Sequence, residues 1–143
     1  MLFGKRERAV KRILVVEDEP LTAFDNESTL RDLGYEVVAT LDSFGEAIRM
    51  LEKEKIDLIL SDVRLSSEQT GIDLARAAKA RGTPTLFATG YDIPNASEVA
   101  IGCLRKPYTE RQLKRALECI DRHLSGKPVK PQKGLELFFA GQS

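Results

Sequence analysis

The chain has 143 residues, of which 42% are hydrophobic and 31% are charged, a composition that favours one globular domain with a core large enough to need no disulfide or structural metal. Its 22 Lys and Arg residues balance 22 Asp and Glu residues, so the overall charge does not favour nucleic acid or an anionic membrane as a partner. Cys103 and Cys119 have no metal-binding or CxxC spacing, and no stretch is long and apolar enough to span a membrane. We therefore expect a reduced, cytoplasmic protein.

Strands and helices are predicted to alternate along most of the chain. Residues 1–11 are basic and carry no clear pattern, so they are treated as an N-terminal extension. Short apolar runs predict strands at residues 12–16, 36–40, 58–60, 85–88 and 101–104. Caps and apolar periodicity predict helices from Pro20 to near Leu33, after the Ser43 and Glu46 capping pair, over about 71–81, and from Thr109 to Leu124.

The segment between the last two strands has a weaker helical pattern. Pro94 and Asn95 interrupt residues 91–100, where only about two helical turns fit. Five strand and helix alternations with right-handed crossovers favour an α/β fold of the flavodoxin-like (βα)5 type. The prediction is a doubly wound parallel sheet of strand order 2-1-3-4-5, with a short or irregular fourth helix.

The last segment, residues 125–143, has a different composition. It begins with a stretch rich in Lys and Pro and then turns apolar at Leu135, Leu137, Phe138 and Phe139. We expect a disordered linker followed by an apolar patch that docks on a helix of the body or on a partner. The predicted organisation is therefore an extension at 1–11, a domain at 12–124 and a tail at 125–143.

Polar residues follow the predicted strands at the point where each strand ends. Glu17 and Asp18 follow the first strand, Asp62 ends the third, Thr89 ends the fourth and Lys106 follows the fifth. The carboxyl ends of parallel strands meet at one edge of the sheet, where ligands bind. Any one of these side chains is a common loop residue, but the full set predicts a site.

Three carboxylates at one edge repel one another and require a compensating charge. Mg²⁺ prefers oxygen ligands and needs only one or two carboxylates, and Lys106 adds one further positive charge. The formal sum of three carboxylates, one Mg²⁺ and Lys106 is zero, so the site is suited to accept a phosphoryl group. Asp62 is the best candidate nucleophile for an aspartyl phosphate, with Lys106 and the Thr89 hydroxyl each placed for a phosphoryl oxygen.

With these residues in place, residues 12–124 resemble a receiver domain of the response regulators of two-component signalling. Glu17 and Asp18 resemble the acidic pair, Asp62 the phosphoacceptor, Thr89 the switch hydroxyl, and Lys106 with Pro107 the Lys-Pro step after the fifth strand. The stretch Phe87-Ala88-Thr89-Gly90-Tyr91 is similar to the signature of the FAT GUY subgroup, whose members are often single-domain response regulators.

The resemblance implies a function and a set of partners. It implies Mg²⁺ held by Glu17, Asp18, Asp62 and the backbone carbonyl of Arg64, and signalling through Thr89, Gly90 and Tyr91. It further implies a histidine kinase, of the HWE or a related type, or a histidine phosphotransfer protein as phosphodonor, and a link to general stress signalling. A signalling protein that is not itself an enzyme, and that is a monomer or weak homodimer, is expected to act through protein contacts or as a phosphate sink.

Three positions depart from the pattern of the family. Glu17 stands where receivers more often have Asp, and its longer side chain is expected to reach a metal-bound water. Ser66 stands where many have Pro, and Cys103 where many have the aromatic residue that rotates in the switch. We therefore expect a switch that changes the order of residues 91–101.

Three other functions compete with this interpretation. A phosphohydrolase of the haloacid-dehalogenase type also uses an Asp after a strand, but it needs a second Asp two positions on, where this chain has Arg64. A pseudo-receiver that binds without phosphorylation is disfavoured by the complete set of Asp18, Asp62, Thr89 and Lys106. A nucleotide-binding relative of flavodoxin is disfavoured because this chain has no glycine-rich phosphate loop after its first strand.

Overall fold

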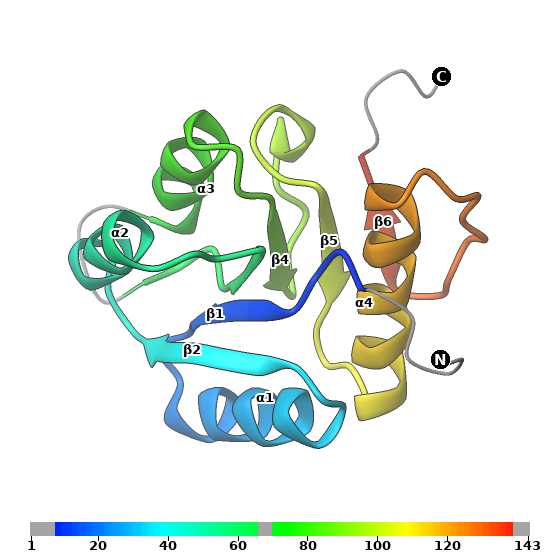
Figure 1. Cartoon of the computed structure of the whole chain (residues 1–143), viewed down its shortest axis with the longest axis horizontal. Coiled ribbons are helices and arrows are strands. Elements are labelled where there is room, and N and C mark those ends of the chain that lie inside the picture. Colours follow the sequence, from blue (N-terminus) through cyan, green and yellow to red (C-terminus); the bar gives the residue numbers. More distant parts are fainter. Residues whose placement is uncertain (1–7, 66–69, 139–143) are drawn as a thin grey trace.

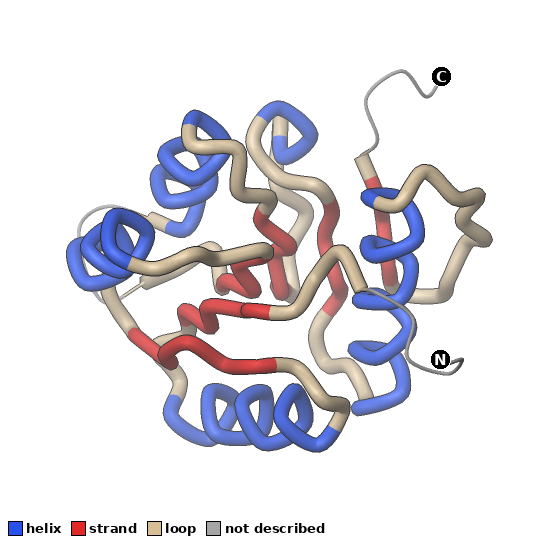
Figure 2. The backbone as a smooth tube through the Cα atoms, in the orientation of Figure 1, coloured by secondary structure: helices blue, strands red, loops and turns tan. Residues whose placement is uncertain are grey.

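A single sheet of six strands runs through the centre of the described chain. The computed structural model describes residues 8–65 and 70–138, and within them the strand order is β2-β1-β3-β4-β5-β6. The first five strands pair in parallel and β6 pairs antiparallel to β5. Figure 2 draws the strands in red. The strands are β1 (Arg12–Val16), β2 (Glu36–Leu41), β3 (Leu58–Ser61), β4 (Thr85–Thr89), β5 (Gly102–Arg105) and β6 (Leu135–Leu137).

Helices cover both faces of this sheet (Figure 1). They are α1 (Pro20–Asp32), α2 (Phe44–Lys53), α3 (Gly71–Ala80) and α4 (Glu110–Leu124), and a 3₁₀ turn, η1 (Ala96–Glu98), lies between β4 and β5. The predicted flavodoxin-like fold and the order 2-1-3-4-5 are confirmed, with β6 added at the edge. The segment between β4 and β5, for which a short or irregular helix was predicted, forms the single 3₁₀ turn η1.

Local signals in the sequence explain where the helices begin. Ser43 caps α2 by accepting a hydrogen bond from the amide of Glu46, and Thr109 and Gln112 form the predicted capping box of α4. Thr70 and Asp73 form a second capping box, at α3, that the sequence analysis did not identify. None of the helices in the described ranges is long and apolar enough to cross a membrane.

The core is divided by the sheet into layers. Side chains of β1, β3, β4 and β5 pack with α1 and α4 on one face, in a cluster that includes Leu30, Leu104 and Leu117. The other face packs against α2 and α3 and, near η1, forms a smaller cluster around Phe87. All four residues of β3 are buried, so Asp62 follows a strand that is fixed on both faces.

The segment after α4 differs from the sequence prediction. The apolar end of this segment was expected to dock on a helix of the body or on a partner, but β6 instead joins the sheet edge beside β5. The predicted linker before it, residues 127–134, contains no helix or strand. Leu135 and Leu137 pack against the cluster between the sheet and α4, and Phe138 packs on the opposite face. The composition of the tail could not predict this pairing, because the pairing depends on the room that Gly102 leaves beside β5. Phe139 and Ser66, both named in the sequence analysis, lie outside the described residues.

Candidate functional site

The polar side chains predicted from the strand ends are brought together at one edge of the sheet. Backbone hydrogen bonds hold this edge: the amide of Asp62 donates to Val16 O at 2.9 Å, and the amide of Glu17 donates to Leu41 O at 2.8 Å. On the other side, the amide of Lys106 donates to Thr89 O at 2.9 Å. The loops that follow β1, β3, β4 and β5 therefore leave the sheet side by side.

Three carboxylates converge in this site. Glu17, Asp18 and Asp62 each offer an oxygen, and these oxygens lie within 4.8 Å of one another. Glu17 is buried, Asp62 is half-buried and Asp18 is exposed. A cluster of hard oxygen donors that opens to solvent on the Asp18 side fits Mg²⁺, which keeps several water ligands when it binds proteins.

Lys106 joins the two less exposed carboxylates. Its Nζ donates to Glu17 Oε1 at 2.9 Å and to Asp62 Oδ2 at 3.3 Å. Burial raises the pKa of Glu17, and the nearby charge of Asp62 adds to this, although hydrogen bonds from Lys106 and from the amide of Glu19 act against it. Burial alone would lower the pKa of Lys106, but its hydrogen bond and its proximity to Glu17 and Asp62 raise it overall. Lys106 therefore remains a cation.

The two carboxylate oxygens of Asp62 have different surroundings. Oδ1 accepts hydrogen bonds from the amides of Val63 at 2.7 Å and Arg64 at 3.4 Å, whereas Oδ2 faces Lys106. The guanidinium of Arg64 lies 5.0 Å from the centroid of the Tyr91 ring, which links the loop after β3 to the loop after β4. The assignment of the Arg64 carbonyl as a metal ligand stays a prediction.

Thr89, at the end of β4, is buried and its hydroxyl accepts a hydrogen bond from the amide of Tyr91 at 3.1 Å. Tyr91 itself is exposed, and Gly90 O accepts a hydrogen bond from the guanidinium of Arg105 at 3.2 Å. The Thr89 hydroxyl thus orients the first turn of the segment that the sequence analysis predicted to switch. Its role toward a phosphoryl group stays a prediction.

The sequence profile of the response regulator receiver domain matches residues 13–118. The chain belongs to this family. Receiver domains are signalling modules that bind Mg²⁺ in an acidic pocket and interact with histidine kinases or phosphotransfer proteins. This receiver has an acidic cluster, formed by Glu17, Asp18 and Asp62, that could hold such an ion. Its fold is similar to that of the chemotaxis response regulator CheY4 of Vibrio cholerae, with 29% identity and a TM-score of 0.67 over 76% of this chain and 97% of that one.

The named relatives of this receiver belong to several different signalling systems. It is 31% identical over 124 residues to the chemotaxis protein CheY of Pseudomonas aeruginosa. The matched region covers 80% of this chain and 99% of CheY. It is 35% identical over 81 residues to the phyllosphere-induced regulator PhyR of Methylorubrum extorquens, but the match covers 55% of this chain and only 30% of PhyR.

A solved structure offers a direct comparison for the acidic pocket. The receiver domain of the sensor histidine kinase PA1611 from Pseudomonas aeruginosa, solved with a magnesium ion coordinated in the active site cleft, is 30% identical with a TM-score of 0.66. The similarity covers 76% of this chain and 95% of that one. The fit of the three carboxylates to Mg²⁺ therefore agrees with a metal observed in a structural relative.

One structural requirement of the receiver site was missed by the sequence analysis. Gly71, the first residue of α3, packs so closely that an added Cβ would lie 2.1 Å from the backbone oxygen of Asp62. Its amide donates to Val63 O at 2.7 Å. The start of α3 thus fixes the backbone on which Asp62 stands. The only signal in the sequence was a glycine directly after the Thr70 cap.

A second missed contact lies behind Lys106. The hydroxyl of Tyr108 donates to Oδ1 of the buried Asn26, on α1, at 2.7 Å. Burial raises the pKa of Tyr108 to about 12. This hydrogen bond ties the loop that carries Lys106 to α1. Neither residue showed a pattern that could have predicted the pairing.

Proposed function

We propose that this receiver accepts a phosphoryl group on Asp62 from a phosphohistidine, and that the modified domain signals through protein contacts. The observation that carries the proposal is the convergence of Asp62 with two other carboxylates, with oxygens within 4.8 Å of one another, together with the contact of Lys106 with Asp62. Membership of the receiver family supports histidine kinases or histidine phosphotransfer proteins as the phosphoryl donors. Mg²⁺ is the expected cofactor.

The surroundings of Asp62 indicate which of its oxygens would attack phosphorus. Asp62 Oδ1 accepts from two backbone amides that cannot leave it without a shift of the loop, whereas the one described donor to Oδ2 is the side chain of Lys106. We therefore assign Oδ2 as the nucleophile. A bond forms between this oxygen and phosphorus as the bond between phosphorus and the donor histidine nitrogen breaks, and that nitrogen keeps the electron pair. When bound between the carboxylates, Mg²⁺ supplies positive charge that screens them from the incoming phosphoryl oxygens.

The chain's own residues have separate tasks in this scheme. Lys106 already contacts the nucleophilic carboxylate, so it needs little movement to bind a phosphoryl oxygen and stabilise its charge. Asp18 and Glu17 would hold the metal, Glu17 from its buried position through water. The Thr89 hydroxyl, at the adjacent strand end, would bind another phosphoryl oxygen and give up its hydrogen bond from Tyr91.

The finer assignment of the pathway rests on the stretch from Phe87 to Tyr91. Its likeness to the FAT GUY signature, together with similarity to PhyR, supports a donor kinase of the HWE or a related type and a role in general stress signalling. A phosphohydrolase is less well supported. The residue two positions after Asp62 is Arg64, whose cation stacks on Tyr91 and cannot act as a general acid.

The experiment that tests the proposal is phosphotransfer profiling. Each histidine kinase of the source genome is autophosphorylated with labelled ATP and mixed briefly with this receiver and Mg²⁺. We expect one or a few kinases to lose label to the receiver within the shortest times, and Asp62→Ala to receive none. Absence of transfer from every kinase and phosphotransfer protein would contradict the proposed donor class.

A further inference from the structure

Strand β6 is built into the edge of β5 through a glycine. Gly102 pairs with Leu137, and a Cβ on Gly102 would lie 2.6 Å from Glu136 O and 2.9 Å from a side-chain carbon of Leu137. All three of the nearest atoms around that position belong to β6. Glycine in a strand often marks a place where another backbone approaches closely, and Gly102 leaves the room that β6 occupies beside β5.

The apolar side chains of β6 and of the residue that follows it pack on opposite faces of the sheet. Leu135 and Leu137 pack with the cluster that includes Leu104, while Phe138 packs against the cluster around Phe87 on the other face. Cys103 of β5 packs against the same cluster as Phe138, so the tail adds an aromatic residue to the face that carries Cys103. The β5 edge therefore binds an extended segment of the pattern Leu-x-Leu-Phe.

Arg105 connects this added strand to the segment that follows Thr89. Its amide donates to Gly134 O at 2.8 Å, at the start of β6. Its guanidinium binds Gly90 O and pairs with Asp92 at 2.5 Å. A cavity of about 480 Å³ lies between the two segments, with Thr89 and Tyr91 on one side and Glu136 and Phe138 on the other. Loss of β6 would remove one wall of this cavity and one anchor of Arg105.

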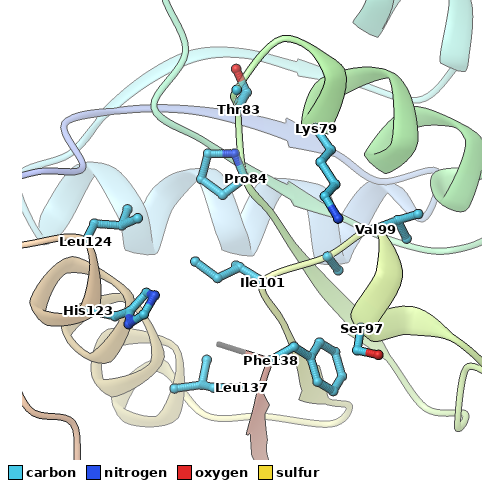
Figure 3. Close-up of a pocket in the computed structure, with 12 residues that line it drawn as sticks. Lys79, Thr83, Pro84, Ser97, Val99, Ile101, His123, Leu124, Leu137 and Phe138 are labelled. Atoms are coloured by element: carbon cyan, nitrogen blue, oxygen red, sulfur yellow. The ribbon is translucent and has the colours of Figure 1, made fainter. Parts of the chain in front are cut away.

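The tail leaves much of its groove unfilled. A second cavity of about 630 Å³ lies at the opposite end of β4 and β5 from Asp62, and Leu137 and Phe138 form one side of it, as Figure 3 shows. Its other walls are largely apolar and include Val99, Ile101 and Leu124. This volume lies within the range of sites that bind apolar groups. An occupant with larger side chains would bury more surface than the described tail does.

We propose that the β5 edge is a strand-docking site, filled in this chain by β6, that binds an extended Leu-x-Leu-aromatic segment of a partner protein in its place. Addition of a strand to an exposed sheet edge is a general mode of peptide recognition. β6 has three residues and its side chains are half-exposed or exposed, so its release costs little compared with unfolding of the domain. Occupancy of the edge sets the position of residues 90–92 through Arg105.

The proposal deepens the proposed function, since residues 90–92 follow the predicted switch residue Thr89. Its test needs no phosphoryl group, so the two fail separately. The probe is a peptide of residues 131–138, followed by amide NMR and hydrogen exchange of the full chain. Leu137→Asp places a charge in an apolar cluster and should release β6, while Lys133→Asp, at an exposed turn position, is the control.

In the Leu137→Asp chain we expect exchange of residues 90–96 to rise about tenfold. The peptide should bind saturably with a dissociation constant of about a millimolar or less, because a tail that stays docked at an effective concentration of about a millimolar must bind at least that tightly. Binding should shift the amides of residues 102–105 and return the exchange of 90–96 to the level of the unmodified chain. A peptide with Ser in place of Leu135, Leu137 and Phe138 should not bind, and Gly102→Ala in the same chain should abolish binding.

Several results would overturn the proposal. One is the absence of saturable binding at peptide concentrations of several millimolar, the range expected for an untethered strand. Another is binding that leaves the exchange of residues 90–96 unaffected. If Leu137→Asp does not fold, Leu137→Ser replaces it, and failure of both to fold would show that β6 is an obligatory part of the core. If the unmodified chain forms dimers and the Leu137→Asp chain does not, the occupant of the edge is a second copy of this chain instead.

Discussion

Lys106 Nζ lies 2.9 Å from Glu17 Oε1, so the cation predicted to bind a phosphoryl oxygen is held by the most buried carboxylate of the site. Glu17 is also bonded to the amide of Glu19 at 3.1 Å. Both of its oxygens therefore have protein donors. Asp18, by contrast, is exposed to solvent at the open side of the cluster. This difference separates a carboxylate that positions Lys106 from one that is free to face a metal.

The first prediction follows from that difference. Asp18→Asn should weaken Mg²⁺ binding by about tenfold, since it removes a charged oxygen that can contact the metal directly. Glu17→Gln should weaken it less, because Glu17 is committed to Lys106 and the Glu19 amide. Calorimetric titration with Mg²⁺ measures both. Asp25→Asn, on the exposed surface of α1, serves as the control, and an equal or reversed order of the two losses would refute the assignment.

The second prediction concerns the backbone beneath Asp62. Gly71→Ala should lower the free energy of unfolding by about 3 kcal/mol, because its Cβ would overlap the backbone oxygen of Asp62 and force the strand end to shift. Gly45→Ala is the matched control. Gly45 lies in α2 with no atom within 4 Å of an added Cβ, so alanine there should be neutral or stabilise by about 0.5 kcal/mol. Urea denaturation measures both, and similar midpoints for the two variants would contradict the structure.

The third prediction concerns the response to phosphorylation. The Thr89 hydroxyl accepts from the Tyr91 amide in the present structure, so its recruitment by a phosphoryl oxygen should release Tyr91. Hydrogen exchange should change most in residues 91–101 when the receiver is phosphorylated. Thr89→Ala should keep the phosphoryl group but lose much of this change. Unaltered exchange in that segment, with a response elsewhere, would show that the switch lies on another face.

The fourth prediction is a pH dependence of stability. The pKa of Tyr108 is raised to about 12 by burial, whereas an unfolded tyrosine has a pKa near 10. The folded state therefore holds this proton more tightly, and the resulting stability is complete below pH 10 and is lost between about pH 10 and 12. Tyr108→Phe should lower stability at pH 7, since Asn26 loses its donor. It should also lose less stability than the unmodified chain as pH rises from about 9 to 11, and parallel curves would exclude this role for Tyr108.

The parts of the fold that sequence could predict are those fixed by local patterns. Apolar runs defined the five parallel strands to within a residue or two, and Ser43 and Thr109 marked helix starts because a cap depends on residues three positions apart. The strand ends in turn predicted which polar side chains meet. Glu17, Asp18 and Asp62 were placed together from topology alone, and the structure brings their oxygens within reach of one ion.

The contacts that sequence did not predict join segments far apart in the chain. Tyr108 and Asn26 are 82 positions apart, and nothing in either neighbourhood indicates the other. β6 looked like part of a flexible tail because Lys and Pro dominate the residues before it, and only the missing side chain of Gly102 shows where it fits. Gly71 is similar: its importance comes from a backbone that approaches from the loop after β3.

The most direct test of the central claim is phosphorylation of Asp62 by a small donor. With Mg²⁺ and acetyl phosphate, intact-mass spectrometry should show one added phosphoryl group on the unmodified chain, and none on Asp62→Ala. Removal of Mg²⁺ with a chelator should prevent labelling, because the three carboxylates would then repel the donor. Labelling of Asp62→Ala to the same extent as the unmodified chain would contradict the account.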